Sequence, residues 1–402
     1  MKKILIFSLV YYPSHIGGAE VAIKEITDRI DPKEIEFDMV CLRFDKNLPK
    51  IEKIGNITIH RIGFTTYNPT MGDLSKFPLQ LNKFLFQFLA TFKALNLHRK
   101  NHYDAIWAMM AHSTGVPAGI FKTFNPKVPY ILTLQEGDPT NYIKSKMKPL
   151  YPLFVKSFTL ADTIQPISTF LSKWALEMGF KGRLEIIPNA VNTKKFSRFY
   201  PKNELDELKF KLGKKSEDKY LITTSRLVKK NAVDDVIRAL PFLPNEIKFV
   251  ILGLGPDLEM LISLAKNLNV IDRVIFLGQV NHGDMPKYLK ISDIFIRPSL
   301  SEGMGNSFIE AMAAELPVIA TQEGGISDFL FDPDINPDKM PTGYAVKPRD
   351  PEGIAKQIIR LMRETELTKK IILNAKKLTF DKYDWDLIAK DMRDRVFLPL
   401  LK

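Results

Sequence analysis

Strand-like and helix-like segments alternate along the first half of this chain. The strand candidates are short apolar runs, and the helix candidates repeat their apolar residues with a period near 3.6. This alternation predicts an α/β fold with a doubly wound parallel sheet. The expected strands are 4–10, 37–42, 57–62, 105–109, 130–134, 163–167 and 184–187, and the expected helices are 19–30, 79–99, 151–160 and 169–178.

A second alternation of the same kind begins near Tyr220. Its expected strands are 220–225, 248–252, 273–277, 293–296 and 318–321. A chain of 402 residues is also too long for one ordinary hydrophobic core. We therefore expect two Rossmann-like domains, residues 1–195 and 196–380, and a C-terminal helix, 381–402, that returns to the first domain.

Composition and charge narrow the class of protein. The chain is 45% hydrophobic and 26% charged, as in soluble globular proteins, and its one cysteine, Cys41, excludes an intramolecular disulfide and fits a reducing, cytoplasmic setting. Residues 1–13 resemble a first strand more than a signal peptide, and no apolar stretch approaches the roughly 20 residues of a membrane span. The net charge of +12 favours anionic partners, but without a nucleic-acid-binding signature we expect no nucleic acid.

The segment 297–325 is typical of a ligand-binding unit of strand, turn, helix and strand. Its turn follows an apolar strand, and ligands of open α/β sheets bind where parallel strands end. Backbone amides at the start of the helix would suit an anionic phosphate. The polar and glycine residues of this unit are Glu302, Gly303, Met304, Gly305, Asn306, Ser307 and Glu310.

The two glutamates have simpler explanations as well. Ser307 and Glu310 match a capping box, in which Glu310 would only bond back to the amide of Ser307 and start the helix. Glu302 precedes the helix, so a cap does not explain it, although surface glutamates are common.

The incomplete glycine motifs of this chain disfavour binding of a nicotinamide or flavin cofactor. Gly17-Gly18 is a bare pair, and Gly253-Leu254-Gly255 lacks the third glycine of the dinucleotide fingerprint. Gly17 and Gly18 still follow the first strand and precede a helix, so their amides could face a phosphate; the alternative is a simple tight turn.

Two cations follow the first strand of the second half. Arg226 stands at the end of that strand and Lys230 lies four residues on. Fixed cations can neutralise a leaving diphosphate as a metal ion does, and no Asp-x-Asp triplet follows an expected strand. We therefore expect a clamp without a metal, against the alternative of a solvated charged surface.

These motifs together resemble the retaining nucleotide-sugar glycosyltransferases of family 4, which have the GT-B fold of two Rossmann-like domains facing across a cleft. Glu302 and Glu310, with seven residues between them, resemble the family's Glu-x7-Glu signature. The segments that carry the rest of the resemblance are Ser225-Arg226-Leu227 with Lys230-Asn231, the connector from Ile187 to Phe196, and Gly17-Gly18.

The resemblance implies roles for individual residues. Arg226 and Lys230 would neutralise the diphosphate of a UDP- or GDP-sugar, Glu310 would bond the ribose hydroxyls, and amides from Gly303 to Ser307 would face the donor. Glu302 would stabilise the oxocarbenium-like transition state. The acceptor hydroxyl would attack from the front face and lose its proton to the leaving phosphate, so the anomeric configuration is kept, with no metal and no cofactor.

The chain departs from the family pattern at the acceptor side. Many relatives carry a histidine where this chain has Gln135 followed by Glu136, and His112 on the preceding loop is the candidate to replace it. The alternative for His112 is a structural or solvated side chain. Ala190 and Ala232 stand where glycines are frequent, which we expect to change turn geometry only.

The acceptor itself stays open at this point. Two stretches, 79–95 and 142–158, combine lysines with Phe, Leu and Tyr, and such helices either lie on an anionic membrane or pack on a sheet. The hydroxyl acceptor is therefore lipid-linked or soluble, with the protein at the inner face of the membrane in the first case. The alternatives to sugar transfer are a nucleotide-sugar epimerase of the same fold and a nucleotide-sugar-binding protein without turnover.

Overall fold

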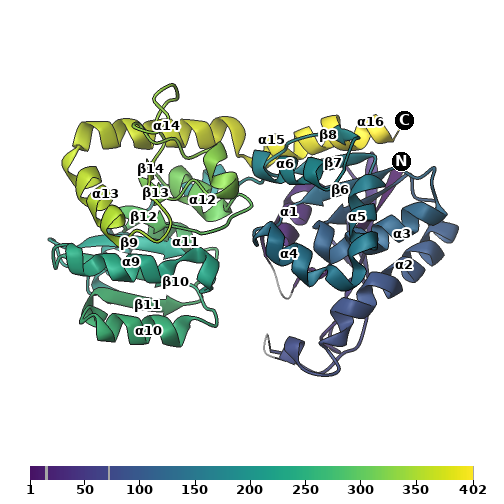
Figure 1. Cartoon of the computed structure of the whole chain (residues 1–402), viewed down its shortest axis with the longest axis horizontal. Coiled ribbons are helices and arrows are strands. Elements are labelled where there is room, and N and C mark those ends of the chain that lie inside the picture. Colours follow the sequence, from purple (N-terminus) through teal and green to yellow (C-terminus); the bar gives the residue numbers. More distant parts are fainter. Residues whose placement is uncertain (14–16, 71–72, 402) are drawn as a thin grey trace. The chain divides into compact units, whose positions relative to one another are not determined.

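The computed structural model describes residues 1–13, 17–70 and 73–401. The chain divides into two compact units: a first unit of Met1–Asn189 with Trp385–Lys402, and a second unit of Ala190–Asp384 (Figure 1). The sequence placed these divisions after residues 195 and 380, and the structure places them at Asn189 and Asp384. Within the described residues, no helix has the length and apolarity needed to cross a membrane.

The first unit is built on an eight-stranded sheet with the order β3-β4-β2-β1-β5-β6-β7-β8. Every neighbouring pair is parallel except β3 with β4, which is antiparallel. The strands are β1 (Lys2–Phe7), β2 (Ile35–Leu42), β3 (Ile51–Ile54), β4 (Ile57–Ile62), β5 (Ala105–Met109), β6 (Tyr130–Leu134), β7 (Thr163–Pro166) and β8 (Arg183–Leu184).

Helices cover this sheet on both faces. Phe7 of β1 packs against Phe121 of α3, and α2, α3 and α5 pack side by side. One face of α2 is buried through Phe86, Ala90 and Ala94, and α2 contacts β1, β2 and β4, so this helix packs on the sheet. The helices of the first half are α1 (Gly18–Thr27), α2 (Leu81–Asn101), α3 (Val116–Phe124), α4 (Thr140–Lys146), α5 (Tyr151–Thr159) and α6 (Thr169–Glu177).

The C-terminal segment packs on the opposite face of the first sheet. Phe397 meets Trp107 of β5 and Phe37 of β2, with ring centroids 5.2 and 5.9 Å away. The expected single helix is wrong in detail: α14 continues to Lys382, and a new helix starts at Trp385. At the break, the carbonyl of Tyr383 accepts a hydrogen bond from the amide of Val191 (3.0 Å). The pieces are α15 (Trp385–Asp391), a π-helical turn (Met392–Phe397) and α16 (Leu398–Leu400).

The second unit carries a six-stranded parallel sheet with the order β11-β10-β9-β12-β13-β14. Its strands are β9 (Lys219–Thr224), β10 (Ile247–Leu252), β11 (Val274–Gly278), β12 (Ile294–Arg297), β13 (Val318–Ala320) and β14 (Tyr344–Ala345). Its helices are α7 (Thr193–Phe196), α8 (Lys202–Lys211), α9 (Val233–Ala239), α10 (Leu258–Asn267), α11 (Met285–Lys290), α12 (Asn306–Ala313), α13 (Pro351–Arg363) and α14 (Thr365–Lys382).

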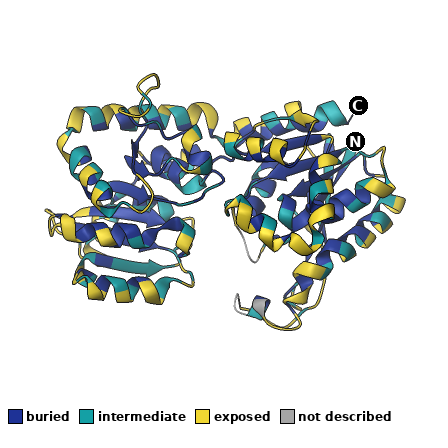
Figure 2. Cartoon of the chain, in the orientation of Figure 1, coloured by how far each residue is buried: buried dark blue, intermediate teal, exposed yellow. Residues whose placement is uncertain are grey.

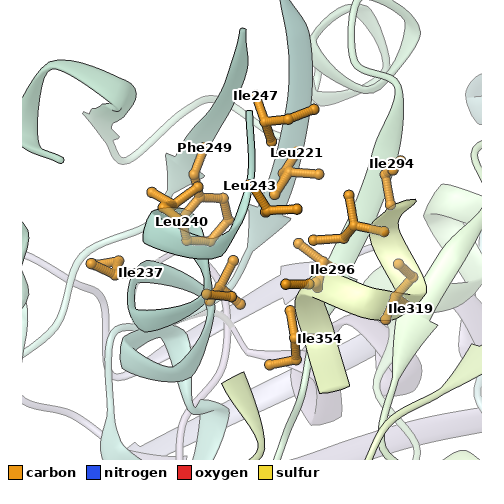
Figure 3. Close-up of a cluster of buried hydrophobic side chains, with 14 of the residues drawn as sticks. Leu221, Ile237, Leu240, Leu243, Ile247, Phe249, Ile294, Ile296, Ile319 and Ile354 are labelled. Carbon is orange, nitrogen blue, oxygen red and sulfur yellow. The ribbon is translucent and has the colours of Figure 1, made fainter. Parts of the chain in front are cut away.

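Alternating side chains of these strands build two cores. Ile294 and Ile296 of β12 join a buried cluster with Ile237 of α9 and Ile354 of α13 (Figure 3). Phe295, between them, points to the other face and packs on Phe308 of α12 at 5.5 Å. Side chains on both faces of β12 are therefore buried. Most strands of this sheet are dark blue in Figure 2, the edge strand β11 is mostly intermediate, and exposed residues gather on helices such as α10. Burial on both faces explains why the strands read as continuous apolar runs.

Most of the expected strands are confirmed, and those at 57–62, 105–109 and 130–134 have the bounds that we expected. The pattern missed β3 and β14. The sequence of β3, IEKI, has two adjacent charged residues between its isoleucines, and these isoleucines are exposed or half-buried, so β3 lacks both the apolar run and the alternation that mark a strand. The two residues of β14 are too few to give a pattern.

The order of strands reverses once in each sheet. In the first unit the chain runs outward on both sides of the pair β1 and β5, and in the second unit on both sides of β9 and β12. Connections leaving such a pair in opposite directions open a crevice at the carboxyl ends of the two strands, where ligands of α/β sheets bind. The loops after these four strands are therefore the places to look for functional residues.

Candidate functional site

The loop after β12 and the start of α12 form the centre of the candidate site. The helix begins at Asn306, and its N-cap is Gly305 in the left-handed conformation (φ 89°). Ser307 therefore lies inside the helix and is not its cap residue, so the capping-box explanation of Glu310 is wrong. The first amides of α12 have no partner earlier in the helix, as at any helix start, and suit an anion.

Gly305 is required here because no side chain fits. A Cβ at this position would lie 2.8 Å from Nη2 of Arg297 and 2.7 Å from the ring of Phe308. The left-handed φ adds a cost for any residue with a Cβ. The glycine thus lets the loop pass directly over the Arg297 side chain.

Arg297, the last residue of β12, holds the loop together. Its Nη2 donates to Oε2 of Glu302 (2.9 Å), its Nη1 to Oγ of Ser307 (2.7 Å) and its Nε to Oγ of Ser299 (3.1 Å). Its guanidinium also lies over the ring of Phe308, 4.2 Å from the centroid. One buried cation therefore fixes Glu302 relative to the start of α12.

Burial has an electrostatic consequence for this side chain. Desolvation lowers the pKa of Arg297, and the carboxylates of Glu302 and Glu310 oppose that shift. A guanidinium stays protonated in proteins, so the positive charge persists next to both carboxylates. The loop accordingly presents a charge pair whose geometry is set before any ligand arrives.

The loop after β13 supports the backbone of Glu302. Gly325 donates its amide to the carbonyl of Glu302 (3.0 Å). A Cβ on the neighbouring Gly324 (φ 61°) would lie only 2.1 Å from that carbonyl oxygen. Close backbone approach between the two loops therefore needs glycine, and it leaves the Glu302 side chain half-buried against Arg297.

Glu310 lies on α12 and faces a histidine from another loop. Nε2 of His282 is 2.9 Å from Oε1 of Glu310, and Nζ of Lys195 is 2.9 Å from Nδ1 of His282. A lysine ammonium only donates, so the imidazole accepts from Lys195 at Nδ1 and donates from Nε2 to Glu310. His282 is largely exposed while Glu310 is half-buried, so solvent reaches this carboxylate from the histidine side.

The loop after β9 brings the two predicted cations to the same edge. The amide of Leu300, in the β12 loop, donates to the carbonyl of Lys230 (2.7 Å), which joins the two loops directly. The carbonyl of Arg226 accepts from Nδ2 of the buried Asn231 (2.6 Å), and the Arg226 side chain is exposed. The structure therefore places Arg226 and Lys230 in the loop after β9, which is the neighbour of β12, the strand that leads to Glu302 and Glu310.

Four further positions hold a glycine, or an alanine where the family often has glycine. A Cβ at Gly253 or Gly255 would come within 1.8 and 2.1 Å of the carbonyls of Ser225 and Leu227, so these glycines serve close packing of the β10 loop on the β9 loop. Ala232 adopts the left-handed conformation (φ 50°), as a glycine would, and Ala190 is not among the residues with positive φ.

The three acceptor candidates cluster in the first unit, after β5 and β6. Nδ1 of His112 lies 3.4 Å from Oε1 of the buried Glu136, and Oγ of Ser113 lies 3.1 Å from Nε2 of His112. Gln135 exchanges two hydrogen bonds of 3.1 Å with Asn189. The structure thus brings His112 and Glu136 together, whereas the Gln135 side chain is bonded to Asn189, where the chain leaves the first unit.

The glycine pair of the first unit has a local partner. Gly17 is the N-cap of α1, and its amide donates to Oε2 of Glu20 (2.7 Å), while Gly18 opens the helix. Burial raises the pKa of Glu20. The Gly17 amide is thus occupied by a carboxylate of its own helix, and the rest of the loop, residues 14–16, lies outside the described residues.

In the ranges 1–13, 17–70 and 73–401, no three His, Cys, Asp or Glu side chains lie together in a way that could hold an ion.

Comparison with known families supplies the decisive observation. A family described as Glycosyltransferase Family 4 matches residues 16–195, and one described as Glycosyl transferases group 1 matches residues 205–378. The chain belongs to glycosyltransferase family 4. The two matched ranges follow each other as the two units do, so both halves of this glycosyltransferase carry the resemblance.

Curated relatives of this glycosyltransferase extend over most of its length. It is 25% identical over 395 residues to an uncharacterized glycosyltransferase of Methanocaldococcus jannaschii, and the aligned residues cover 97% of this chain and 96% of the relative. It is 27% identical over 341 residues to the alpha-monoglucosyldiacylglycerol synthase of Streptococcus pneumoniae, which covers 82% of this chain and 73% of that enzyme.

Solved structures establish the fold of this glycosyltransferase as GT-B. The Anabaena protein HepE in complex with UDP and glucose superimposes with a TM-score of 0.75 at 19% identity, over 98% of this chain and 99% of that one. At this identity the likeness concerns the fold alone, in agreement with the two parallel-sheet units described above.

Sequence reasoning about this glycosyltransferase missed three supporting features. Arg297 has no role in the sequence analysis, although a charged residue directly after the apolar strand expected at 293–296 is itself a signal. Gly324 and Gly325 end the segment 297–325, and they have no function in the sequence analysis. His282 lies in a loop far from Glu310 in sequence, and nothing in its neighbourhood indicated the contact.

Proposed function

We propose that this glycosyltransferase moves a sugar from a UDP- or GDP-sugar to a hydroxyl acceptor with retention of the anomeric configuration and without a metal ion. One observation carries the proposal: the loop after β9, with the two cations, and the loop after β12, with Glu302 and leading into the helix of Glu310, meet where the strand order reverses and are joined by the bond from Leu300 to Lys230. Opposite charges at such an edge suit a sugar linked to a diphosphate.

In the proposed reaction each group has one task. Arg226 and Lys230 neutralise the charge that develops on the leaving diphosphate, together with the amides at the start of α12. Glu302, fixed by Arg297, faces the sugar and stabilises the positive charge on its anomeric carbon. Glu310 accepts hydrogen bonds from the ribose hydroxyls.

The bonds and protons balance without another reactant. The bond from the anomeric carbon to the phosphate oxygen breaks, and the acceptor oxygen forms its new bond on the same face of the sugar. The acceptor proton passes to the leaving phosphate oxygen. Retention follows because attack and departure use one face, and the cations supply the charge neutralisation that a metal ion supplies elsewhere.

Known proteins support the proposed substrates in different degrees. The UDP and glucose bound to the similarly folded HepE favour a UDP-sugar donor. The name of the pneumococcal relative, a monoglucosyldiacylglycerol synthase, favours a lipid-borne hydroxyl. A lipid acceptor places the enzyme at the cytoplasmic face of a membrane, and the exposed Phe84, Leu89 and Phe92 on the outer side of α2 are suited to touch it.

A donor panel tests the proposal. UDP-, GDP- and ADP-sugars are incubated with the enzyme with and without candidate lipid and sugar acceptors, and free nucleotide is measured. We expect nucleotide release from one donor, faster with the right acceptor and unchanged in EDTA, and NMR of the product should show the donor's anomeric configuration. Release of an epimerised sugar without any acceptor, loss of activity in EDTA, or an inverted product would each contradict the corresponding part.

A further inference from the structure

The first unit contains a pocket of about 300 Å³ that the donor chemistry does not use. Leu9, just after β1, and His112, just after β5, lie on its wall. These two strands are the pair at which the order of the first sheet reverses, so the pocket occupies the position where this class of sheet binds ligands. Helices α2 and α4 and the turn Lys148–Leu150 supply the rest of the wall.

Two lysines give the pocket its charge. Lys83 of α2 and Lys146 of α4 both lie on the wall, and neither forms an ion pair within the part of the chain that the structure describes. Desolvation, followed by the charge of Lys146, lowers the pKa of Lys83. Both lysines are exposed, and two ammonium groups that repel each other are stabilised by an anion that binds both.

The remaining wall is mostly apolar. Phe84, Met147 and Leu150 line it, and Met147 is buried while Phe84 is about half exposed (53%). The ring of Phe84 also lies 6.0 Å from that of Phe88 along the exposed side of α2. An apolar segment attached to the anion would bury this surface, which a small inorganic ion would leave in water.

The floor of the pocket carries two irregularities of the backbone. His112 lies in a π-helical turn, Ala111–Gly115, and the residue before that turn, Met110, has a φ of 70°. Such turns and strained residues occur often at functional sites because their cost must be offset by a gain elsewhere. Here they bring His112 to the wall with Glu136 behind it.

We infer that this pocket binds the acceptor through an anionic group held by Lys83 and Lys146, with an attached apolar segment against Phe84, Met147 and Leu150. The inference rests on the proposed function in calling the ligand an acceptor; the binding chemistry stands on the pocket alone. A phosphate or carboxylate on a lipid and the same group on a soluble amphiphile share this chemistry.

Calorimetry with the full chain tests the site. The probe is hexyl phosphate, and 1-hexanol is the neutral probe of equal chain length, both without any sugar donor. We expect hexyl phosphate to bind more tightly than 1-hexanol, and Lys83→Gln and Lys146→Gln each to weaken it by about tenfold. Lys148→Gln, an exposed lysine of the same segment that does not line the pocket, is the matched control and should leave binding unchanged.

Equal binding of both probes, or equal loss in Lys148→Gln, would overturn the anionic site. Sedimentation with phosphatidylglycerol and phosphatidylcholine vesicles then identifies the source. Capture by the anionic vesicles that Lys83→Gln reduces and hexyl phosphate displaces indicates a lipid acceptor; hexyl phosphate binding without capture indicates a soluble one. Donor hydrolysis measured in parallel distinguishes the two proposals. Hydrolysis without probe binding would contradict only the proposed anionic site, and probe binding without hydrolysis would contradict only the proposed sugar transfer.

Discussion

At the scale of single residues, the main property of the site is that its charged side chains are held in fixed positions. Glu302 is held by a buried guanidinium and by its own backbone contact with Gly325, so its carboxylate meets a ligand in one orientation. Preorganised charge of this kind acts mainly on the transition state, because the enzyme does not have to reorganise when charge develops there.

The first prediction concerns Glu302. Glu302→Gln keeps the size and one acceptor oxygen but removes the charge, so turnover should fall by roughly 10²-fold while nucleotide affinity changes little. Steady-state kinetics with the active donor, together with calorimetry of UDP or GDP binding, measure both. Equal losses in turnover and nucleotide affinity would show that Glu302 acts in donor binding instead.

The second prediction concerns Arg297 as a positioning residue. Arg297→Lys keeps the charge, but one ammonium cannot hold Glu302, Ser307 and Ser299 in the fixed directions of a guanidinium. We expect kcat to fall by about tenfold with little change in donor KM. Thermal melting serves as the control, because a role in folding alone would lower Tm and leave kcat of the folded enzyme intact.

The third prediction concerns Glu310. Glu310→Gln still accepts from His282 but offers the ribose hydroxyls a neutral group, so nucleotide affinity should weaken by roughly tenfold, the difference between a charged and a neutral hydrogen bond. Calorimetry with the nucleoside diphosphate measures it, and His282→Ala, which removes the partner and leaves the carboxylate, should bind at least as well as the wild type. A lower Tm with unchanged affinity in Glu310→Gln would assign Glu310 to stability.

At the scale of elements, the turn between β12 and α12 determines whether the parts of the site meet. Its geometry depends on Gly305, which passes over Arg297 in a conformation that other residues rarely adopt. The β13 loop then closes on the same turn through Gly324 and Gly325.

The fourth prediction separates strain from collision at that turn. Gly305→Ala should cost more than the ~1–2 kcal/mol of a left-handed alanine, because its methyl group also meets Arg297 and Phe308, and it should lower kcat through the displaced guanidinium. Gly213→Ala is the matched control: Gly213 has a φ of 67° with no atom within 4 Å of a Cβ. Equal losses of unfolding free energy in the two variants would show that the collision with Arg297 and Phe308 contributes nothing.

At the scale of the whole molecule, the chain crosses between its units twice. Trp385–Lys402 follows the second unit in sequence but belongs to the first, where Phe397 is fully buried against Phe37 and Trp107. The last residues of the chain are thus part of the core of the first unit.

The fifth prediction follows from this crossing. If the units unfold separately, Phe397→Ala should destabilise the unit that contains residues 1–189 by about 3–5 kcal/mol and leave the transition of the other unit in place. Ile358→Ala, which is equally buried in α13, should do the reverse. Calorimetry follows both transitions, and UDP binding at rising temperature identifies the second unit; a shift of both transitions in each variant would show a single cooperative molecule.

The sequence by itself determined the class of fold, the two sheets and the family, and it suggested the residues that we propose for the donor site. These follow from local information: apolar periodicity marks the strands and helices, and Glu302, Glu310, Arg226 and Lys230 lie at fixed spacings after them. Local pattern also explains the errors. The strand β3 buries too little to leave a pattern, and Ser307 matched a cap only because spacing cannot tell which residue begins a helix.

Only the tertiary structure decided what surrounds those residues. The contact of His282 with Glu310 and the closing of Gly325 on Glu302 join segments that the chain keeps apart, and no periodicity encodes such a meeting. The pocket with Lys83, Lys146 and His112 likewise forms from four separate segments. Side-chain contacts across loops depend on where whole elements pack, so they exist only once the sheets and helices have assembled.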